Sequence, residues 1–327
     1  MAPAIVVITI AVFVLLPLWL VAAVVASTWL PGKWRAVRML YMALLYLVME
    51  SAMLLALFGL WLASGFGARL KTPYFQEIHY GLARVFLGTL FRQGTRVLKT
   101  EVVAEGVSEA DLIGKPLLVF SRHAGPGDSF ILMHALLSWY DREPRIVLKH
   151  TLAWDPMFDV LLGRIPAQFV NPNPGPGSGL EAAISRLATG LDDDDAFVIF
   201  PEGGNFTENR RTRGIERLHK LGLHKMAERA ESMTYVLAPR PGGVVAALEA
   251  SPNAQVVLVG HTGVDHLHTV SDLWRELPMD KRITMRWWLV DPADIPTDRE
   301  SRIDWLYGWW ETIDQWITEN RVPEPTD

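Results

Sequence analysis

Two histidine–aspartate pairs with the same spacing are the first candidates for chemistry in this chain of 327 residues. His123 and Asp128 lie in "SRHAGPGDSF", and His150 and Asp155 lie in "HTLAWD". In the first pair, a glycine-proline-glycine turn lets the backbone fold tightly enough to bring the carboxylate to the imidazole. An aspartate that holds one imidazole nitrogen leaves the other nitrogen to take a proton. Asp128 is equally well placed to cap the apolar helical run that it begins, so both roles stay open.

The composition disfavours several other kinds of reactive site. The chain contains no cysteine, which excludes disulfides, thiolate metal sites and a cysteine nucleophile. The Gly-Ser-Gly at 177–179 lacks the spacing of a serine-hydrolase nucleophile elbow. In "HTGVDHLH", the residues His261, Asp265, His266 and His268 offer imidazole and carboxylate ligands, but their order does not fit the usual tight arrangement. We therefore expect a polar loop there and no bound metal.

Two blocks resemble the glycerolipid acyltransferases typified by 1-acylglycerol-3-phosphate acyltransferase. "RHAGPGD" resembles the His-four-residues-Asp block of that family, and "FPEGGNFTENRR" resembles its Phe-Pro-Glu-Gly block. The segment between them and the "LAPRPGGV" that follows are also similar, so the resemblance covers about Lys115 to Ala250. The resemblance places His150 in the connecting segment. It therefore implies that His123 and Asp128 are the catalytic residues.

The resemblance implies a membrane-bound O-acyltransferase that uses no cofactor. It would move a fatty acyl group from acyl-CoA or acyl carrier protein to a lysophospholipid such as 1-acylglycerol-3-phosphate, giving phosphatidic acid. His123 would remove the proton of the acceptor hydroxyl while Asp128 orients the ring, without an acyl-enzyme, and backbone N–H groups of either glycine-rich loop would stabilise the oxyanion. The alternatives are another lysolipid or headgroup alcohol as acceptor, a thioesterase that uses the same pair, and a non-enzymatic membrane scaffold.

The same resemblance indicates where substrate binds. Glu202 is expected to position the acyl acceptor. The family usually continues with Thr-Arg where this chain has Gly204 and Asn205, so a phosphate-binding cation must come from elsewhere, and the basic segment Asn209–Lys225 lies close by. That segment also suits the phosphates of coenzyme A, anionic headgroups or a solvated helix face. The expected substrate-binding residues are Arg122, Gly127, Arg164, Pro201, Glu202, Gly203, Gly204, Arg211 and Arg213.

The elements that position these residues are predicted from the hydrophobic pattern. Short apolar runs alternate with helical stretches, and each run ends in a polar, His- or Gly-bearing loop. This pattern predicts an α/β fold with a mostly parallel central sheet flanked by helices, in which chemistry gathers beyond the strand C-termini. Helix starts are expected at Ser178 and Thr297, and "DDDD" (192–195) is expected to be a solvated turn. The predicted strands are "PLLVF", "RIVLK", "AFVIF" and "QVVLVG".

The N-terminal residues predict a membrane-embedded helical hairpin over 1–70, followed by the acyltransferase domain over 71–327. Residues 4–30 carry no charge, and the second apolar stretch, 39–66, is interrupted only by Glu50. Each exceeds the ~20 residues that cross a bilayer. Basic residues flank both ends of the second stretch, which conflicts with two full spans unless one segment is re-entrant or interfacial. A further helix, over about 74–91, would lie on the bilayer or pack against the catalytic domain.

Charge and hydrophobicity indicate which partners and which location to expect. The net charge of −5 and the pI near 6.0 argue against nucleic acid as a partner. Membrane lipid and the acyl donor are the expected partners, and the sequence says nothing of the oligomeric state. We expect an integral protein of the cell membrane with its active site on the cytoplasmic face.

Overall fold

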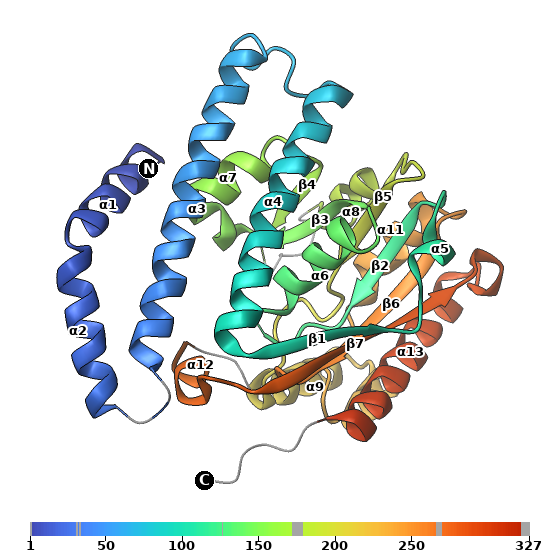
Figure 1. Ribbon diagram of the computed structural model, residues 1–327. Coiled ribbons are helices and arrows are strands. Elements are labelled where there is room, and N and C mark those ends of the chain that lie inside the picture. The colour runs from blue at the N-terminus through green and yellow to red at the C-terminus, as the bar shows by residue number, and fades with distance from the viewer. Residues whose placement is uncertain are drawn as a thin grey trace. The chain divides into compact units, whose positions relative to one another are not determined.

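The structure is a computed structural model that describes residues 2–30, 32, 34–125, 127–171, 179–265 and 270–321. The expected helix cap Ser178 and the loop histidines His266 and His268 lie outside these residues. The chain divides into two compact units (Figure 1). One comprises residues 1–101, 150–166 and 269–281, and the other comprises 102–149, 167–268 and 282–327. The expected domain boundary at residue 70 stays a prediction.

The first unit consists of helices. Pro73–Leu98 confirms the helix expected over 74–91, and it contacts the long helix that precedes it. The elements of this unit are α1 (Ala2–Val14), α2 (Leu16–Trp29), α3 (Arg35–Ala63), α4 (Pro73–Leu98), η1 (His150–Trp154), α7 (Pro156–Leu162) and α12 (Val270–Glu276).

The first apolar stretch, which was predicted to be membrane-embedded, is not one continuous helix. It breaks at Leu15 into α1 and α2, which are bent by 66°. Pro17 lies in the first turn of α2, where its missing N–H interrupts the helical hydrogen bonds, so the sequence contained the signal for this break. Within the described residues, α3 is long and apolar enough to cross a bilayer, and α1 with α2 is a second candidate if the pair is one broken span.

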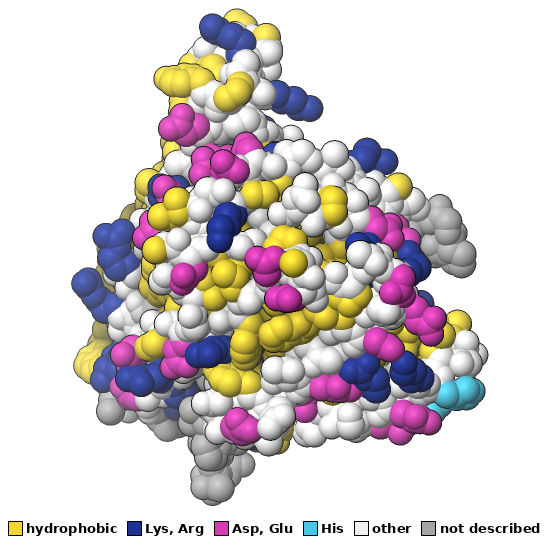
Figure 2. Space-filling view, turned by 90° about the vertical axis from the view of Figure 1, so that its right-hand side faces the viewer, with side chains coloured by type: hydrophobic (Ala, Val, Ile, Leu, Met, Phe, Trp, Pro, Cys, Tyr) yellow, Lys and Arg dark blue, Asp and Glu magenta, His cyan; other side chains and the backbone are white. Residues whose placement is uncertain are grey.

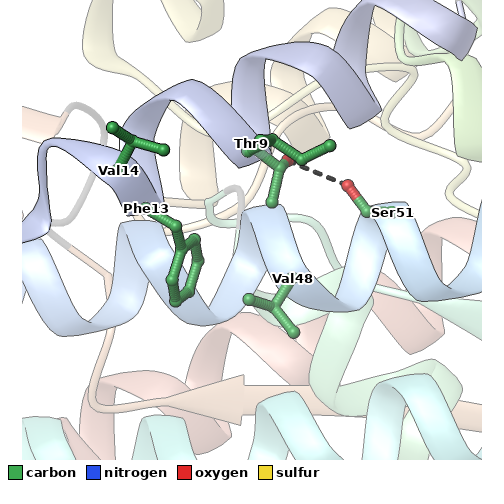
Figure 3. A pocket seen from close by; sticks show the side chains of 6 residues that line it. Thr9, Phe13, Val14, Val48 and Ser51 are labelled. Atoms are coloured by element: carbon green, nitrogen blue, oxygen red, sulfur yellow. Dashed lines mark hydrogen bonds between the residues drawn. The ribbon is translucent and has the colours of Figure 1, made fainter.

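A groove of about 530 Å³ lies between α1 and α3. Its lining is mostly apolar, and the Thr9 and Ser51 hydroxyls hydrogen-bond across it at 2.8 Å (Figure 3). None of its lining side chains is an acid or a base, so this groove offers no group for proton transfer. The lining residues are Thr9, Ile10, Phe13, Val14, Val48 and Ser51.

The second unit is built on a seven-stranded sheet with the order β1-β7-β6-β2-β5-β3-β4. The pairs β6–β2, β2–β5, β5–β3 and β3–β4 are parallel, and β7 runs antiparallel to β6. The predicted mostly parallel α/β sheet is therefore confirmed. The strands are β1 (Thr100–Glu105), β2 (Leu117–Ser121), β3 (Glu143–Lys149), β4 (Ala167–Val170), β5 (Asp195–Ile199), β6 (Gln255–Thr262) and β7 (Lys281–Val290).

Helices cover both faces of this sheet (Figure 1). Alternate residues of the central strands, such as Leu118 and Phe120, pack against α8, α11 and α13 in the main core, and α6 contacts β3. The strands are apolar on both faces because both faces are covered. The helices are α5 (Glu109–Leu112), α6 (Asp128–Ser138), α8 (Leu180–Ala188), α9 (Glu208–Lys220), α10 (His224–Ser232), α11 (Pro241–Ala250), η2 (Pro292–Asp294) and α13 (Arg299–Asn320).

One local prediction in this unit was wrong, and another was confirmed in part. The N-cap of α13 is Asp298 in place of Thr297, and its carboxylate accepts a bond from Ser301 N at 2.9 Å. Residues 192–194 are exposed before β5, as predicted, whereas Asp195 begins β5 and its buried carboxylate pairs with Arg145. Figure 2 shows acidic and basic side chains interspersed with hydrophobic ones over the face that it presents.

Candidate active site

The sheet brings three polar loops together at one edge. Strand β2 pairs in parallel with β5 through Phe120 and Ile199, and with β6 through Ser121 and Val259. The segments that leave the C-terminal ends of these strands therefore lie next to each other. They carry His123 after β2, Glu202 after β5 and His261 at the end of β6.

The imidazole of His123 contacts the carboxylate of Asp128. Nδ1 of His123 lies 2.9 Å from Oδ1 and 3.0 Å from Oδ2. Helix α6 has Gly127 as its N-cap and no side-chain cap, and the Asp128 carboxylate accepts bonds from Ala124 N at 2.6 Å and Gly125 N at 3.0 Å. Of the two roles left open for Asp128, the structure therefore supports the contact with His123 and not the helix cap.

Asp128 is 3% exposed and is held as an anion. Burial by itself would raise the pKa of Asp128. The hydrogen bonds from His123 and His261, together with the electrostatic interaction of these two imidazoles with the carboxylate, outweigh burial and hold the pKa of Asp128 well below its usual range. Because a carboxylate only accepts hydrogen bonds, Nδ1 of His123 carries the proton that faces it. The lone pair of a neutral imidazole then lies on Nε2.

The His123 ring presents Nε2 away from this carboxylate. The ring packs at a centroid distance of 4.7 Å from the Phe200 ring, and the His123 side chain is 12% exposed. Within the ranges that the structure describes, no side chain or carbonyl bonds to His123 Nε2. His123 can therefore accept a proton from a ligand at this atom.

Glu202 ties the loop of His123 to the segment before α11. Its Oε1 accepts from His123 N at 3.2 Å and its Oε2 from Leu237 N at 3.1 Å, and the side chain is 2% exposed. Phe206 N also donates to His123 O at 2.8 Å. Glu202 therefore sets the position of the His123 backbone, and its expected contact with an acyl acceptor stays a prediction. Pro201 O likewise accepts from Arg240 N, at 2.9 Å.

Replacement of Glu202 by glutamine is expected to lower the melting temperature in detergent. One of the two buried N–H groups would then face an amide NH₂ in place of an acceptor, which costs about 1–3 kcal/mol. Burial raises the pKa of Glu202 from 4.5 to about 8, so the folded state binds this proton more tightly than the unfolded state. Its contribution to stability is complete below pH 4.5 and is lost as the pH rises to about 8.

The measurement is the melting temperature of the wild type and the Glu202→Gln variant across that pH range. The wild type should lose stability toward pH 8 relative to the variant. Glu216→Gln, at an exposed position of α9, is the control and should follow the wild type. If the melting temperatures of the wild type and of Glu202→Gln change with pH in parallel, the raised pKa of Glu202 is contradicted.

Arg122 is fully buried, so its guanidinium does not reach a surface where substrate could bind. It donates to His261 O at 2.7 Å and to Tyr235 O at 2.8 Å, and it pairs with Asp265. Asp265 also accepts from Thr262 Oγ1 at 2.7 Å. In the described part of the chain, no group of three His, Asp or Glu side chains is arranged to hold a metal ion.

Three cations surround the Gly203–Gly204 bend. A Cβ on Gly204 would lie 3.2 Å from Arg210 Nη1 and 3.7 Å from Lys149 Nζ, and one on Gly203 would lie 3.0 Å from Arg240 Cζ. Gly203 also has a φ of +69°, which disfavours other residues. The two glycines therefore leave the space that these cations occupy. We refer to Lys149, Arg210 and Arg240 as the cation cluster.

The charges of the cation cluster repel one another. Burial lowers the pKa of Lys149, and the charges of Arg210 and Arg240 lower it further. Burial also lowers the pKa of Arg240, with added repulsion from Arg217 and Arg210. An anion bound among these side chains would relieve that repulsion. Sequence reasoning missed Lys149 and Arg240, although Lys149 ends a predicted strand and Arg240 lies in the "LAPRPGGV" block.

The other basic residues that were expected to bind substrate do not belong to the cation cluster. Arg211 is engaged with backbone carbonyls, donating to Met233 O at 2.6 Å and to Glu231 O at 2.8 Å. Arg213 is exposed on α9. Arg164 belongs to the first unit, where it donates to Leu57 O at 2.7 Å. A substrate contact for any of these three stays a prediction.

The second histidine–aspartate pair is not built like the first. Asp155 is the N-cap of α7, and its Oδ1 accepts from Met157 N at 3.0 Å and Phe158 N at 3.1 Å. Its Oδ2 accepts from the Tyr46 hydroxyl. Both oxygens of this carboxylate are therefore used by the α7 backbone and by Tyr46.

Two comparisons with known proteins found matches. A family model described as "Acyltransferase" matches residues 94–258. Among solved structures, the chain is similar to the 1-acyl-sn-glycerophosphate (LPA) acyltransferase PlsC from Thermotoga maritima, with a TM-score of 0.56 and 16% identity. That match covers 89% of this chain and 100% of the other, and it shows a common fold. No curated protein matches the sequence.

Proposed function

The chain belongs to the acyltransferase family, and on that premise we propose that it acylates a lysophospholipid at the membrane. The acyl donor is acyl-CoA or acyl carrier protein, and the acceptor is a lysolipid with a free hydroxyl, such as 1-acylglycerol-3-phosphate, which gives phosphatidic acid. The observation that carries the proposal is the His123–Asp128 contact at 2.9 Å, which leaves His123 Nε2 without a partner among the described residues.

His123 is the general base in this reaction. Its Nε2 takes the proton of the acceptor hydroxyl as the oxygen attacks the thioester carbonyl, and the imidazolium that forms is stabilised by the Asp128 carboxylate. The proton then passes to the leaving thiolate, which departs as the free thiol. The acyl group moves directly to the acceptor oxygen, so no acyl-enzyme is formed.

Backbone N–H groups after β5 are the better candidates for the oxyanion. The N–H groups of Ala124 and Gly125 both donate to Asp128, so they are already used. The N–H groups of Gly204 and Asn205 make no bond to any residue that the structure describes. Donors held in place before the reaction stabilise a developing oxyanion without further reorganisation. We assign that role to Gly204 and Asn205.

The cation cluster is the proposed binding site for the acceptor phosphate. Lys149, Arg210 and Arg240 surround the Gly203–Gly204 bend, and the resembling family usually has Thr-Arg in place of Gly204 and Asn205. Arg210 lies against Gly204 and so supplies a guanidinium at the same bend. A phosphate there would be held by charge-assisted hydrogen bonds. Acceptors that carry a phosphate monoester should therefore be preferred.

Removal of a cluster cation is expected to weaken binding of the acceptor and not of the acyl donor. For Lys149→Ala and Arg210→Ala, we expect the KM for 1-acylglycerol-3-phosphate to rise by about ten- to hundredfold, the cost of a lost charge-assisted bond. Steady-state kinetics with each substrate varied in turn measures this. Arg186→Ala removes an exposed cation from α8 and is the matched control. A rise confined to the KM for acyl-CoA would show that the cluster binds the donor.

The experiment that tests the function is a panel of lysolipids offered with one acyl-CoA, followed by identification of the products by mass. The expected product is the diacyl lipid of an acceptor that bears a phosphate monoester, formed together with one free coenzyme A. Release of free fatty acid at the same rate with and without acceptor would instead establish a thioesterase.

The proposed location is the membrane. Helix α3 is long and apolar enough to cross a bilayer, which supports an integral protein. The active site is proposed to face the cytoplasm because both acyl donors are found there. Labelling of an exposed lysine near the site in sealed vesicles of known orientation tests the sidedness.

A further inference from the structure

We propose that His261 is a positioning residue that holds the Asp128 carboxylate against His123. This inference rests on the proposed function of the His123–Asp128 pair. His261 comes from β6, on the other side of β2 from the loop that carries Glu202. It is 2% exposed, and its Nε2 lies 3.3 Å from Asp128 Oδ2.

The surroundings of His261 fix the hydrogen on Nε2. Among the described residues, the groups within reach of this atom are Asp128 Oδ2 and, at 3.4 Å, the carbonyl oxygen of Arg122, and both only accept hydrogen bonds. The other ring nitrogen, Nδ1, is buried and has no partner in the described part of the chain. His261 is therefore placed to donate a hydrogen to Asp128 Oδ2.

The contact completes a set of donors around one oxygen. Asp128 Oδ2 accepts from Ala124 N, Gly125 N and His261 Nε2, and His123 Nδ1 lies 3.0 Å from it. The loop supplies the two backbone donors, whereas among the described residues it is His261 that ties the carboxylate to the sheet. A rigid strand at this position fixes the direction in which the carboxylate faces His123.

Charged groups from several elements act on this pair. Arg122 donates to the carbonyl of His261, and Asp265 interacts electrostatically with Arg122 and with His261. Lys149 and Glu202 also interact electrostatically with Asp128. These groups stay in place when the His261 side chain changes, so a change in the pH profile of a His261 variant reports the lost donor.

Removal of the donor should have two effects. The carboxylate becomes less well positioned, and it also becomes more basic because one hydrogen bond to the anion is lost. A more basic Asp128 stabilises the His123 imidazolium, so the acidic limb of the pH–rate profile should move to higher pH. For His261→Leu and His261→Asn, whose amide is too short to reach Asp128, we expect kcat to fall about tenfold and the limb to rise by about half a pH unit.

His261→Gln is the test of the donor, because its longer amide can place an N–H near the position of Nε2. It should keep kcat within about threefold of the wild type and leave the acidic limb in place. His224→Leu, at an exposed position of α10, is the control and should leave both quantities unchanged. Melting temperatures of all variants show that each is folded.

Loss of kcat and a raised limb in the leucine and asparagine variants, with rescue by glutamine, supports the inference. Equal behaviour of all three variants, or a leucine variant that matches the wild type, overturns it. His123→Ala measured in parallel separates the two claims. An active His123→Ala refutes the proposed function, whereas an inactive His123→Ala beside an unaffected His261→Leu refutes only the role of His261.

Discussion

Replacement of His123 by alanine is expected to lower kcat by about 10²–10⁴-fold, the usual contribution of a general base. The variant lacks the atom that takes the proton of the acceptor hydroxyl. Because the His123 side chain is 12% exposed and its N–H and carbonyl make the bonds that join the two loops, the fold should persist. Acceptor-dependent release of coenzyme A, followed with a thiol reagent, measures the change.

His150→Ala is the matched control for this experiment. It removes the histidine of the second pair, whose aspartate caps α7. Its kcat should stay within about twofold of the wild type, as for most exposed substitutions. Full activity of His123→Ala, or a comparable loss in His150→Ala, would contradict the assignment of His123 as the base.

Asp128→Asn is expected to cost about 10³–10⁴-fold in kcat, because the amide reverses the tautomer of His123. The N–H groups of Ala124 and Gly125 both donate to Oδ2, so the amide oxygen of asparagine must take that position. Its NH₂ then faces His123 Nδ1, which becomes an acceptor. The hydrogen moves to Nε2, where the base is needed.

The measurement is kcat for Asp128→Asn across the pH range, with the melting temperature as the test of folding. Asp155→Asn is the control, because asparagine is as good an N-cap as aspartate and α7 should be retained. A kcat within about tenfold of the wild type in Asp128→Asn would show that the tautomer of His123 does not control the reaction.

The central strands and the edge that carries the site follow from the sequence. β2, β3, β5 and β6 are short apolar runs that end in polar loops, and strands covered on both faces require this pattern. Strands β1, β4 and β7 were missed. In β7, Ile283, Met285 and Trp287 alternate with less buried positions, as in an amphipathic strand.

The site residues that could not be predicted from the sequence are brought together by the pairing of the strands. Lys149, Arg240 and His261 come from three separate segments, and only the pairing of β2 with β5 and β6, and of β5 with β3, brings their regions together. In the sequence His261 is one of several potential metal ligands in a polar loop, whereas in the structure its Nε2 lies 3.3 Å from Asp128 Oδ2. Periodicity fixes which residues share a face but not which strands are neighbours.

The role of Arg122 could not be read from its neighbours in the chain either. Its position beside His123 indicated a substrate contact, but at 0% exposure its charge is balanced by Asp265 and by backbone carbonyls. The direction of a side chain that leaves the end of a strand depends on the packing around it. Sequence patterns define the position of such a residue and not its partners.

The most direct test of the account is a single turnover with radiolabelled acyl-CoA, sampled before and after a lysolipid is added. If His123 activates the acceptor for direct transfer, the protein carries no label before the addition, and afterwards coenzyme A and labelled diacyl lipid appear in equal amounts. A covalently labelled protein, or coenzyme A released at the full rate before any acceptor is present, would contradict the account.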